Sequence, residues 1–279
     1  GKKEPDANAD ALIWHADVRR MLLTQKAIAE GGRAMIYAAA QTADLMVDAG
    51  RRQDRATQDK HDDTLGFYTP ILKGFLTEMG LEAANLGIQV FGGHGYIHEH
   101  GMEQIARDAR IATLYEGTTG IQALALLGRK VLLGTRGKCV RDFSRIMLRS
   151  AKAHWLAHGS IGRMARSTAK RAIEWNLLTL RIMRRVGKDR DLVGSASVDY
   201  LMYSGYVMMA HFWVRQAAVA QTFLRNGKGA ESAEFYRAKI QTAEFYFDRL
   251  LPRADAHRKS ALAPTRSLMQ MGNGDFAFS

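Results

Sequence analysis

The sequence predicts an all-α protein in which one helical bundle is followed by a second, four-helix bundle. Apolar and small residues recur at alternating steps of three and four in several long stretches, which is the period of an amphipathic helix. No apolar–polar alternation of period two occurs between hairpin turns, so no strand is expected. Only 4 of the 279 residues are proline, which permits long helices.

Four helices are predicted in the first part of the chain. The first runs from Asp17, a suitable N-cap, to Gly50, with a stripe that includes Ala29 and Ile36. The segment 51–64 is highly charged and is expected to form an exposed loop. The second helix is expected to begin at Thr69-Pro70 and to end at Gly92-Gly93, and two shorter helices are expected over 102–112 and 120–133.

Small and basic residues at 134–138 predict a domain boundary that separates residues 1–134 from residues 135–279. Behind the boundary, four further stripes predict long helices joined by short turns that contain glycine. An antiparallel four-helix bundle is the simplest arrangement for them. Their expected ranges are 140–154, 161–186, 198–224 and 233–250.

Composition limits the function classes without choosing one. A single cysteine, Cys139, cannot form an internal disulfide, which favours a reducing compartment. No leader-like segment and no apolar run of membrane-spanning length is present, so a cytoplasmic protein is expected. The net charge of +12 would attract polyanions. Two basic helix faces carry much of it, and they are either solvated exteriors or a nucleic-acid surface: Arg141, Arg145, Arg149 and Lys152, then Arg181, Arg184, Arg185 and Lys188.

Residues 89–122 contain the densest group of chemically active side chains. His94, His98 and His100 have a spacing that could suit a metal, but the surrounding glycines interrupt a regular helix and no second ligand cluster occurs, so no metal site is expected. The glycine cluster at 92–95 follows a helix rather than a strand, which excludes the usual dinucleotide fingerprint.

Glu116 is the acid of most interest because it lies beside Leu114 and Tyr115, with Gly117 behind it. Partial burial in such surroundings would suit a carboxylate to accept a carbon-bound proton. The alternative is that Glu116 caps the end of a helix.

The sequence of this stretch reads QVFGGHGYIHEHGMEQIARDARIATLYEGTTGIQ. It resembles the C-terminal helical domain of FAD-dependent acyl-CoA dehydrogenases in three features with matching order and spacing: the glycine-rich helix end, the Arg-Asp-Ala-Arg segment at 107–110, and Tyr-Glu-Gly-Thr at 115–118. The resemblance covers residues 12–134. The helical region behind it resembles the larger branch of the family, which includes 3-methylmercaptopropionyl-CoA dehydrogenase.

The resemblance implies that Glu116 removes the α-proton of an acyl-CoA thioester while FAD accepts hydride from the β-carbon, which gives the 2,3-enoyl-CoA. The Glu116 N–H and a flavin ribityl hydroxyl would bond the thioester carbonyl oxygen. Tyr115 and Gly117 would line the acyl pocket, and Thr118 would contact the flavin nucleotide. The sequence departs from the family pattern at Gly120, where many members carry glutamine.

The resemblance also implies partners. Gln89, Gly92 and Gly93 would approach the adenosine-diphosphate part of the FAD held by a neighbouring subunit, which makes a homo-oligomer part of the site. Electron-transfer flavoprotein or a similar acceptor would reoxidise the flavin.

Members of the family carry an N-terminal helical domain and a middle β-domain, for which there is no room before residue 12. We therefore expect a C-terminal fragment or one of two polypeptides, which by itself binds FAD weakly or not at all and has no dehydrogenase activity. Two alternatives remain open: a nucleic-acid-binding relative that uses the basic second bundle, and a second bundle whose role is purely structural.

Overall fold

The computed structural model describes residues 3–4, 8–227 and 229–277, and within these ranges all regular secondary structure is helical. The predicted fold class is therefore confirmed. Part of the expected opening linker (residues 1–2 and 5–7) and residue 228, in the turn expected at 226–229, lie outside the described residues.

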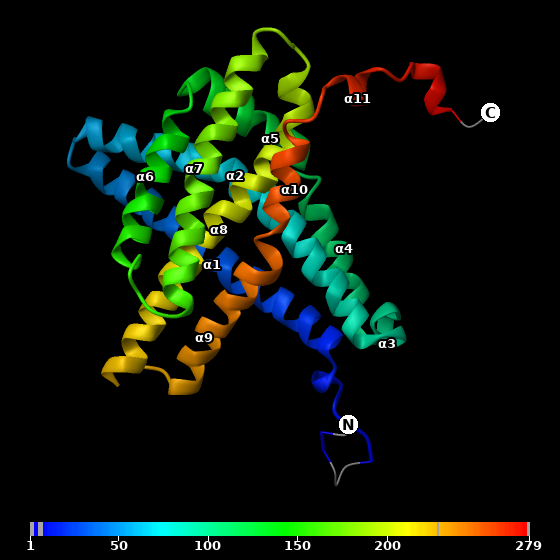
Figure 1. The fold of residues 1–279 in the computed structure, drawn as a ribbon. Coiled ribbons are helices and arrows are strands. Elements are labelled where there is room, and N and C mark those ends of the chain that lie inside the picture. The colour runs from blue at the N-terminus through cyan, green and yellow to red at the C-terminus, as the bar shows by residue number, and fades with distance from the viewer. Residues whose placement is uncertain (1–2, 5–7, 228, 278–279) are drawn as a thin grey trace.

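The first part of the chain is organised around two long antiparallel helices, α1 (Ala16–Arg51) and α2 (Arg55–Phe91), which pack along each other (Figure 1). A short turn of helix, α3 (Gly93–Tyr96), follows α2. The chain then returns along α2 as α4 (Met102–Ala112) and α5 (Thr119–Leu124), and it continues as the π-helix η3 (Ala125–Gly134). The helix predicted over 102–112 and the break after it are confirmed.

The start of α2 corrects one prediction, because the helix begins at Arg55 rather than at Thr69. The charged segment that was expected to be a loop is therefore largely helical. The Asp54 side chain caps this start by accepting the Thr57 N–H at 3.1 Å. Charged side chains do not interrupt a helix whose outer face meets water. Pro70 removes one backbone hydrogen bond inside α2, and the helix continues through it because Pro70 itself is buried in the packing of this segment.

The ends of α1 differ from the prediction in the same way. Asp17 is not the N-cap but lies in the first turn, where it pairs with Arg20 at 2.8 Å. Gly50 is still helical, and the left-handed residue that follows the helix is Gln53, with φ of 60°.

The buried face of α1 agrees with the predicted stripe only in part. Gly32 and Ala39 of that stripe are buried. Ala29 and Ile36 are exposed, whereas Ile28 and Met35, each one residue earlier, are buried. The buried face therefore includes positions one residue before the predicted stripe as well as part of that stripe. Small residues on both faces of α1 made the two stripes hard to distinguish.

The second part is the predicted bundle, with α6 (Lys138–Ala153), α7 (Ser160–Val186), α8 (Leu192–Asn226) and α9 (Ala233–Phe245). The fourth helix continues beyond its predicted end through the π-helix η4 (Tyr246–Leu250) into α10 (Arg253–Ser260), which packs on α8. Two short helices, α11 (Arg266–Met269) and η5 (Asn273–Phe276), end the described chain. A short helix also precedes α1, η1 (Leu12–Trp14).

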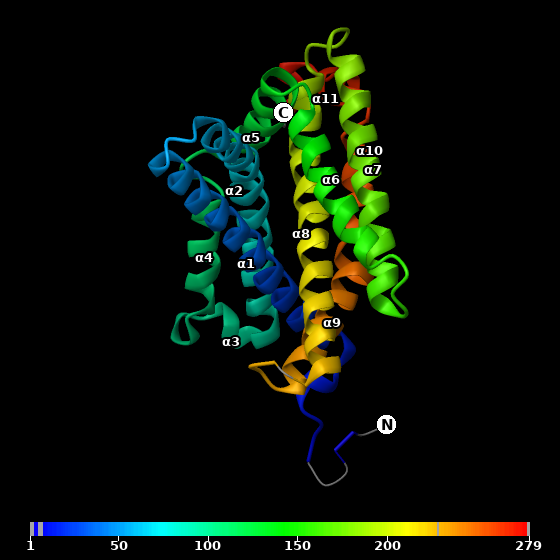
Figure 2. The same cartoon turned by 90° about the vertical axis from the view of Figure 1, so that its left-hand side faces the viewer.

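Helix α8 joins the two parts, because it contacts α7, α9 and α10 on one side and α1, α2 and α5 on the other (Figure 2). Glycines allow the close approach. A Cβ atom at Gly205 would lie 2.1 Å from Cγ of Phe75 on α2, so only glycine fits there. The Trp213 indole N–H donates to the Ala27 carbonyl at 3.3 Å. One continuous apolar core therefore runs through both parts and holds α2 in place as the support of the site.

Candidate functional site

The bend between α4 and α5 contains Tyr115, Glu116, Gly117 and Thr118, and it is tied to α2 at both ends. The Lys73 ammonium donates to the Ala112 carbonyl where α4 ends. The Thr119 hydroxyl donates to the Glu78 carboxylate where α5 begins. The two ends also meet directly, because the Thr119 N–H donates to the Thr113 carbonyl at 3.3 Å.

The backbone at the centre of the bend has an unusual conformation. Glu116 has φ of 54° and Gly117 has φ of 97°. The left-handed region costs a residue with a Cβ atom about 1–2 kcal/mol, so the closed bend forces Glu116 into this conformation. The Gln122 side-chain amide donates to the Glu116 carbonyl at 3.3 Å and holds the carbonyl oxygen.

The same turn leaves the Glu116 N–H without an acceptor among the described residues. Most backbone N–H groups in folded proteins have a partner, so a free donor beside a carboxylate is available to a ligand. The bend thus presents an acid and a hydrogen-bond donor from one residue.

Glu116 is exposed in this chain, which corrects the expectation of partial burial. Residues 114–116 of the bend are all exposed, so no element of the described chain covers them. Tyr115 is likewise about half-exposed, with the Lys73 Nζ atom 5.3 Å from the centre of its ring. The apolar neighbours seen in the sequence line the bend without enclosing it.

Gln89, Gly92 and Gly93 lie together at the other end of the same helix. Gly92 ends α2 with φ of 63°, and its N–H donates to the Gln89 carbonyl at 3.1 Å. At 1.5 Å per residue, Gly92 lies about 21 Å along the axis from Glu78, which anchors the bend. The structure therefore forms two separate groups from the predicted site residues, one at the bend and one at the helix end.

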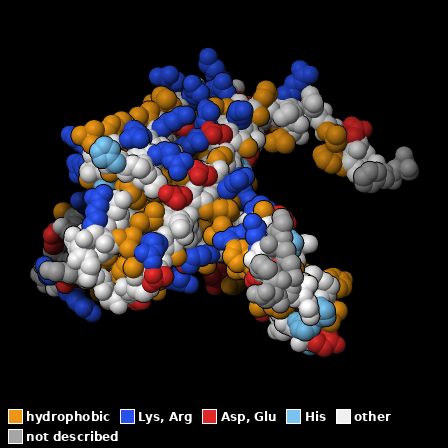
Figure 3. Space-filling model, turned by 60° about the horizontal axis from the view of Figure 1, so that its bottom comes forward, with side chains coloured by type: hydrophobic (Ala, Val, Ile, Leu, Met, Phe, Trp, Pro, Cys, Tyr) orange, Lys and Arg blue, Asp and Glu red, His pale blue; other side chains and the backbone are white. Residues whose placement is uncertain are grey.

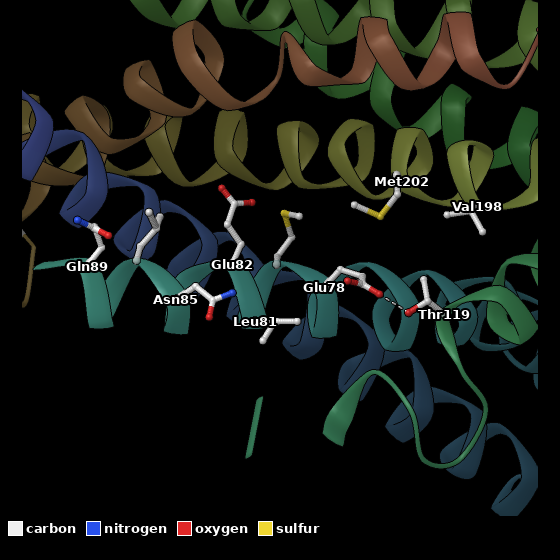
Figure 4. Close-up of a pocket in the computed structure, with 10 residues that line it drawn as sticks. Glu78, Leu81, Glu82, Asn85, Gln89, Thr119, Val198 and Met202 are labelled. Atoms are coloured by element: carbon white, nitrogen blue, oxygen red, sulfur yellow. Dashed lines mark hydrogen bonds between the residues drawn. The ribbon is translucent and has the colours of Figure 1, made fainter. Parts of the chain in front are cut away.

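A groove of about 730 Å³ between α2 and α8 lies between these two groups (Figure 4). Met202 and Val198 point into it from α8, and Glu82 points towards α8 from α2. The groove was not predicted from the sequence. A signal was present, because polar residues recur along α2 at steps of four, three and four residues: Glu78, Glu82, Asn85 and Gln89.

The histidines do not form a metal site in the part of the chain that the structure describes, where no group of three or more potential ligands converges. His98 Nδ1 lies 3.0 Å from the Glu103 carboxylate, and the rings of His94 and His100 lie 5.1 Å apart, edge to face. In the described ranges, no helix is both long enough and apolar enough to cross a membrane.

Comparison with known proteins gives two family matches. The family described as "Acyl-CoA dehydrogenase, C-terminal domain" matches residues 3–132, and "Acetyl-CoA dehydrogenase C-terminal like" matches residues 141–272. Neither match supports a nucleic-acid-binding function.

Among curated proteins, 3-methylmercaptopropionyl-CoA dehydrogenase of Ruegeria pomeroyi is 35% identical over 89% of this chain and 41% of its own length. The broad-specificity linear acyl-CoA dehydrogenase FadE5 of Mycobacterium tuberculosis is 29% identical over 95% of this chain and 44% of its own length. The chain therefore spans about two fifths of these relatives. A crystal structure of acyl-CoA dehydrogenase complexed with FAD from Bacillus anthracis has the same fold, with a TM-score of 0.69 and 15% identity over 96% of this chain and 45% of that chain.

Proposed function

Because this chain consists of C-terminal domains of the acyl-CoA dehydrogenase family, we propose that it is the C-terminal portion of an FAD-dependent enzyme that oxidises an acyl-CoA thioester to the 2,3-enoyl-CoA. The observation that carries this proposal is the conformation of Glu116. A non-glycine residue held in the left-handed region at an exposed bend is the kind of local strain that is found at functional sites.

Glu116 has two tasks in this reaction. Its carboxylate accepts the α-proton of the thioester, and its exposed position leaves the carboxylate accessible to substrate. Its unpartnered N–H donates to the thioester carbonyl oxygen, where negative charge develops as the proton leaves. The hydrogen bond from Gln122 to the Glu116 carbonyl, and the two hydrogen bonds between the ends of the bend and α2, keep the Glu116 carboxylate and N–H in place. Bound FAD supplies the acceptor for the hydride from the β-carbon.

The glycines at the end of α2 fit the approach of a nucleotide. Gly93 has an ordinary φ, and a Cβ atom placed on it would meet nothing within 4 Å, so nothing in the described part of the chain requires glycine there. A glycine that neither its backbone conformation nor its packing requires leaves room for another molecule to approach the backbone closely. In the proposal, Gln89, Gly92 and Gly93 contact the adenosine-diphosphate part of FAD.

The separation of the two groups along α2 supports a shared site. In the proposal, which here follows the family resemblance, Gly92 and Gly93 contact the FAD of a neighbouring subunit, and Thr118 contacts the FAD whose flavin faces Glu116; the helix end and the anchor of the bend lie about 21 Å apart along α2. Tyr115 and Gly117 line the acyl pocket. The protein is accordingly a homo-oligomer that passes electrons to electron-transfer flavoprotein or a similar acceptor. We also propose residues 1–134 and 135–279 as its two domain units.

The test uses the complete protein with its cofactor. Glu116→Gln keeps the size and the hydrogen-bonding capacity of the side chain but removes the base. We expect FAD to remain bound at the wild-type ratio and anaerobic bleaching of the flavin by acyl-CoA to be lost almost completely. The control Glu99→Gln changes an exposed acid in the short helix η2 (His98–His100) and should bleach normally. Normal bleaching by Glu116→Gln would show that another group is the base.

The chain by itself lacks the rest of the cofactor surface in this proposal. We expect the purified 279-residue chain to bind FAD weakly or not at all and to have no dehydrogenase activity. A purified chain with one equivalent of yellow flavin would contradict this.

A further inference from the structure

The C-terminal arm, which we define as residues 266–277, follows a segment that is packed against the rest of the protein. Ala261 and Thr265 are buried, and the Thr265 hydroxyl donates to the Asp189 carboxylate at 2.6 Å. Every described residue after Thr265 is exposed. The arm runs away from the helices in the ribbon view and projects from the body in the space-filling view (Figures 1 and 3).

The composition of the arm does not suit an exposed tail. Four of its large apolar side chains are more than half exposed: Leu268 (60%), Met269 (60%), Met271 (53%) and Phe276 (67%). Single exposed apolar residues are normal on a protein surface, whereas a short segment that exposes four of them is typical of a segment that binds another surface.

The groove between α2 and α8 has the complementary character. Val198 is 43% exposed in it although it is apolar, and Met79 and Met202 form its floor. The Glu78 carboxylate at its edge accepts from the Thr119 hydroxyl but has no cationic partner in the described chain. Arg266, at the root of the arm, has no carboxylate partner in the same residues and bonds only Gln270.

We propose that this groove is the docking site for the C-terminal arm of a second copy of this chain. The direction of the arm favours a second copy, because the arm runs away from α2 and α8, the helices that line the groove of its own chain (Figure 1). Leu268 and Met269 cover the apolar floor, and Arg266 pairs with Glu78 of the other copy. In a twofold-symmetric pair each arm fills the groove of the other chain, so the contact is made twice.

The position of the groove gives a further reason, which rests on the proposed function. The groove is lined at one end by Gln89, which the proposal places, together with Gly92 and Gly93, against the FAD of a neighbouring subunit. Exchange of arms would therefore stabilise the homo-oligomer in which, in the proposed function, a neighbouring subunit completes the cofactor site.

Site-directed cross-linking tests the contact in the purified 279-residue chain. In a Cys139→Ala background, which removes the single cysteine, Val198→Cys and Leu268→Cys are placed on separate chains that are then mixed and oxidised. We expect a disulfide-linked dimer on a non-reducing gel. The control pairs Leu268→Cys with Val219→Cys, an exposed position on α8 away from the groove, and should give no dimer.

A chain that carries both cysteines separates the possible outcomes. If oxidation of this double variant gives only an internal link, or if no link forms in any combination, the docking of a second copy is wrong. An internal link alone would mean that the arm closes on its own groove.

Sedimentation equilibrium supplies an independent measurement. Truncation after Thr265, and the substitution Leu268→Asp, should each raise the dissociation constant of the dimer at least tenfold. Leu156→Asp, at an 88% exposed leucine on the turn before α7, should leave it unchanged. An unchanged constant for the truncated chain would overturn the proposal. Neither experiment measures flavin or acyl-CoA, so failure here leaves the proposed function untouched, and a failure of that function leaves these results intact.

Discussion

Replacing Glu116 by glycine should make the chain more stable, because it relieves the left-handed backbone at the bend. Glu116→Ala is the reference, since it removes the same carboxylate but keeps a Cβ atom at φ of 54°. The left-handed conformation costs a residue with a Cβ atom about 1–2 kcal/mol. Glycine avoids this cost, but it loses about 0.5–1 kcal/mol relative to alanine because the unfolded chain is more flexible at a glycine. Glu116→Gly should therefore exceed Glu116→Ala by about 0.5–1 kcal/mol.

The assay is urea unfolding of the isolated chain, followed by circular dichroism at 222 nm, with the midpoints of matched variants compared. Gln41, an exposed residue inside α1, provides the control pair. There the order should reverse, with glycine about 0.5–1 kcal/mol less stable than alanine. If glycine is also the less stable residue at position 116, Glu116 is not strained, and the main physical support for its role is lost. In the complete enzyme, the same glycine variant should lack the base and fail to bleach.

Two further predictions concern the packing around α8. Burial lowers the pKa of His211 to about 4, so the folded state keeps the ring neutral while the unfolded state binds a proton below pH 6.5. The contribution of His211 to the free energy of unfolding should therefore be fully present above pH 6.5 and fall by about 3 kcal/mol as the pH drops to 4. His211→Phe should reduce this pH dependence in urea titrations, whereas the control His158→Phe, at an exposed position, should not. Gly205→Ala should cost about 1–3 kcal/mol by forcing Phe75 aside, whereas Gly194→Ala, where a Cβ atom meets nothing within 4 Å, should be neutral or stabilising in thermal melts.

Helix type and approximate position could be predicted from the sequence because each long helix buries one face. The apolar period of 161–186, for example, coincides with α7 from Ser160 to Val186. The ends of the helices were harder to predict from the sequence. The capping bond of Asp54 and the tolerance of Pro70 inside α2 both depend on packing that a local pattern does not contain.

The candidate site was found in part. The chemical character of residues 115–118 was visible because glutamate, glycine and threonine stand together at a break between two helical patterns. The exposure of Glu116 was not visible, since its apolar neighbours in sequence do not enclose it in space. Glu78 was missed because its contact with Thr119 joins residues that are far apart in the chain.

The sequence by itself determined that the protein is all-helical and that it belongs with acyl-CoA dehydrogenases, and it singled out the break at Glu116 as the candidate catalytic segment. These properties are local, because a period, a glycine or a short motif needs only its neighbours. The tertiary structure alone decided which face of α1 is buried, that Glu116 has a left-handed backbone and an N–H without an acceptor among the described residues, and that the two groups of predicted site residues lie apart along α2. Those properties arise from contacts between distant segments, which the packing of α2 against α4, α5 and α8 creates.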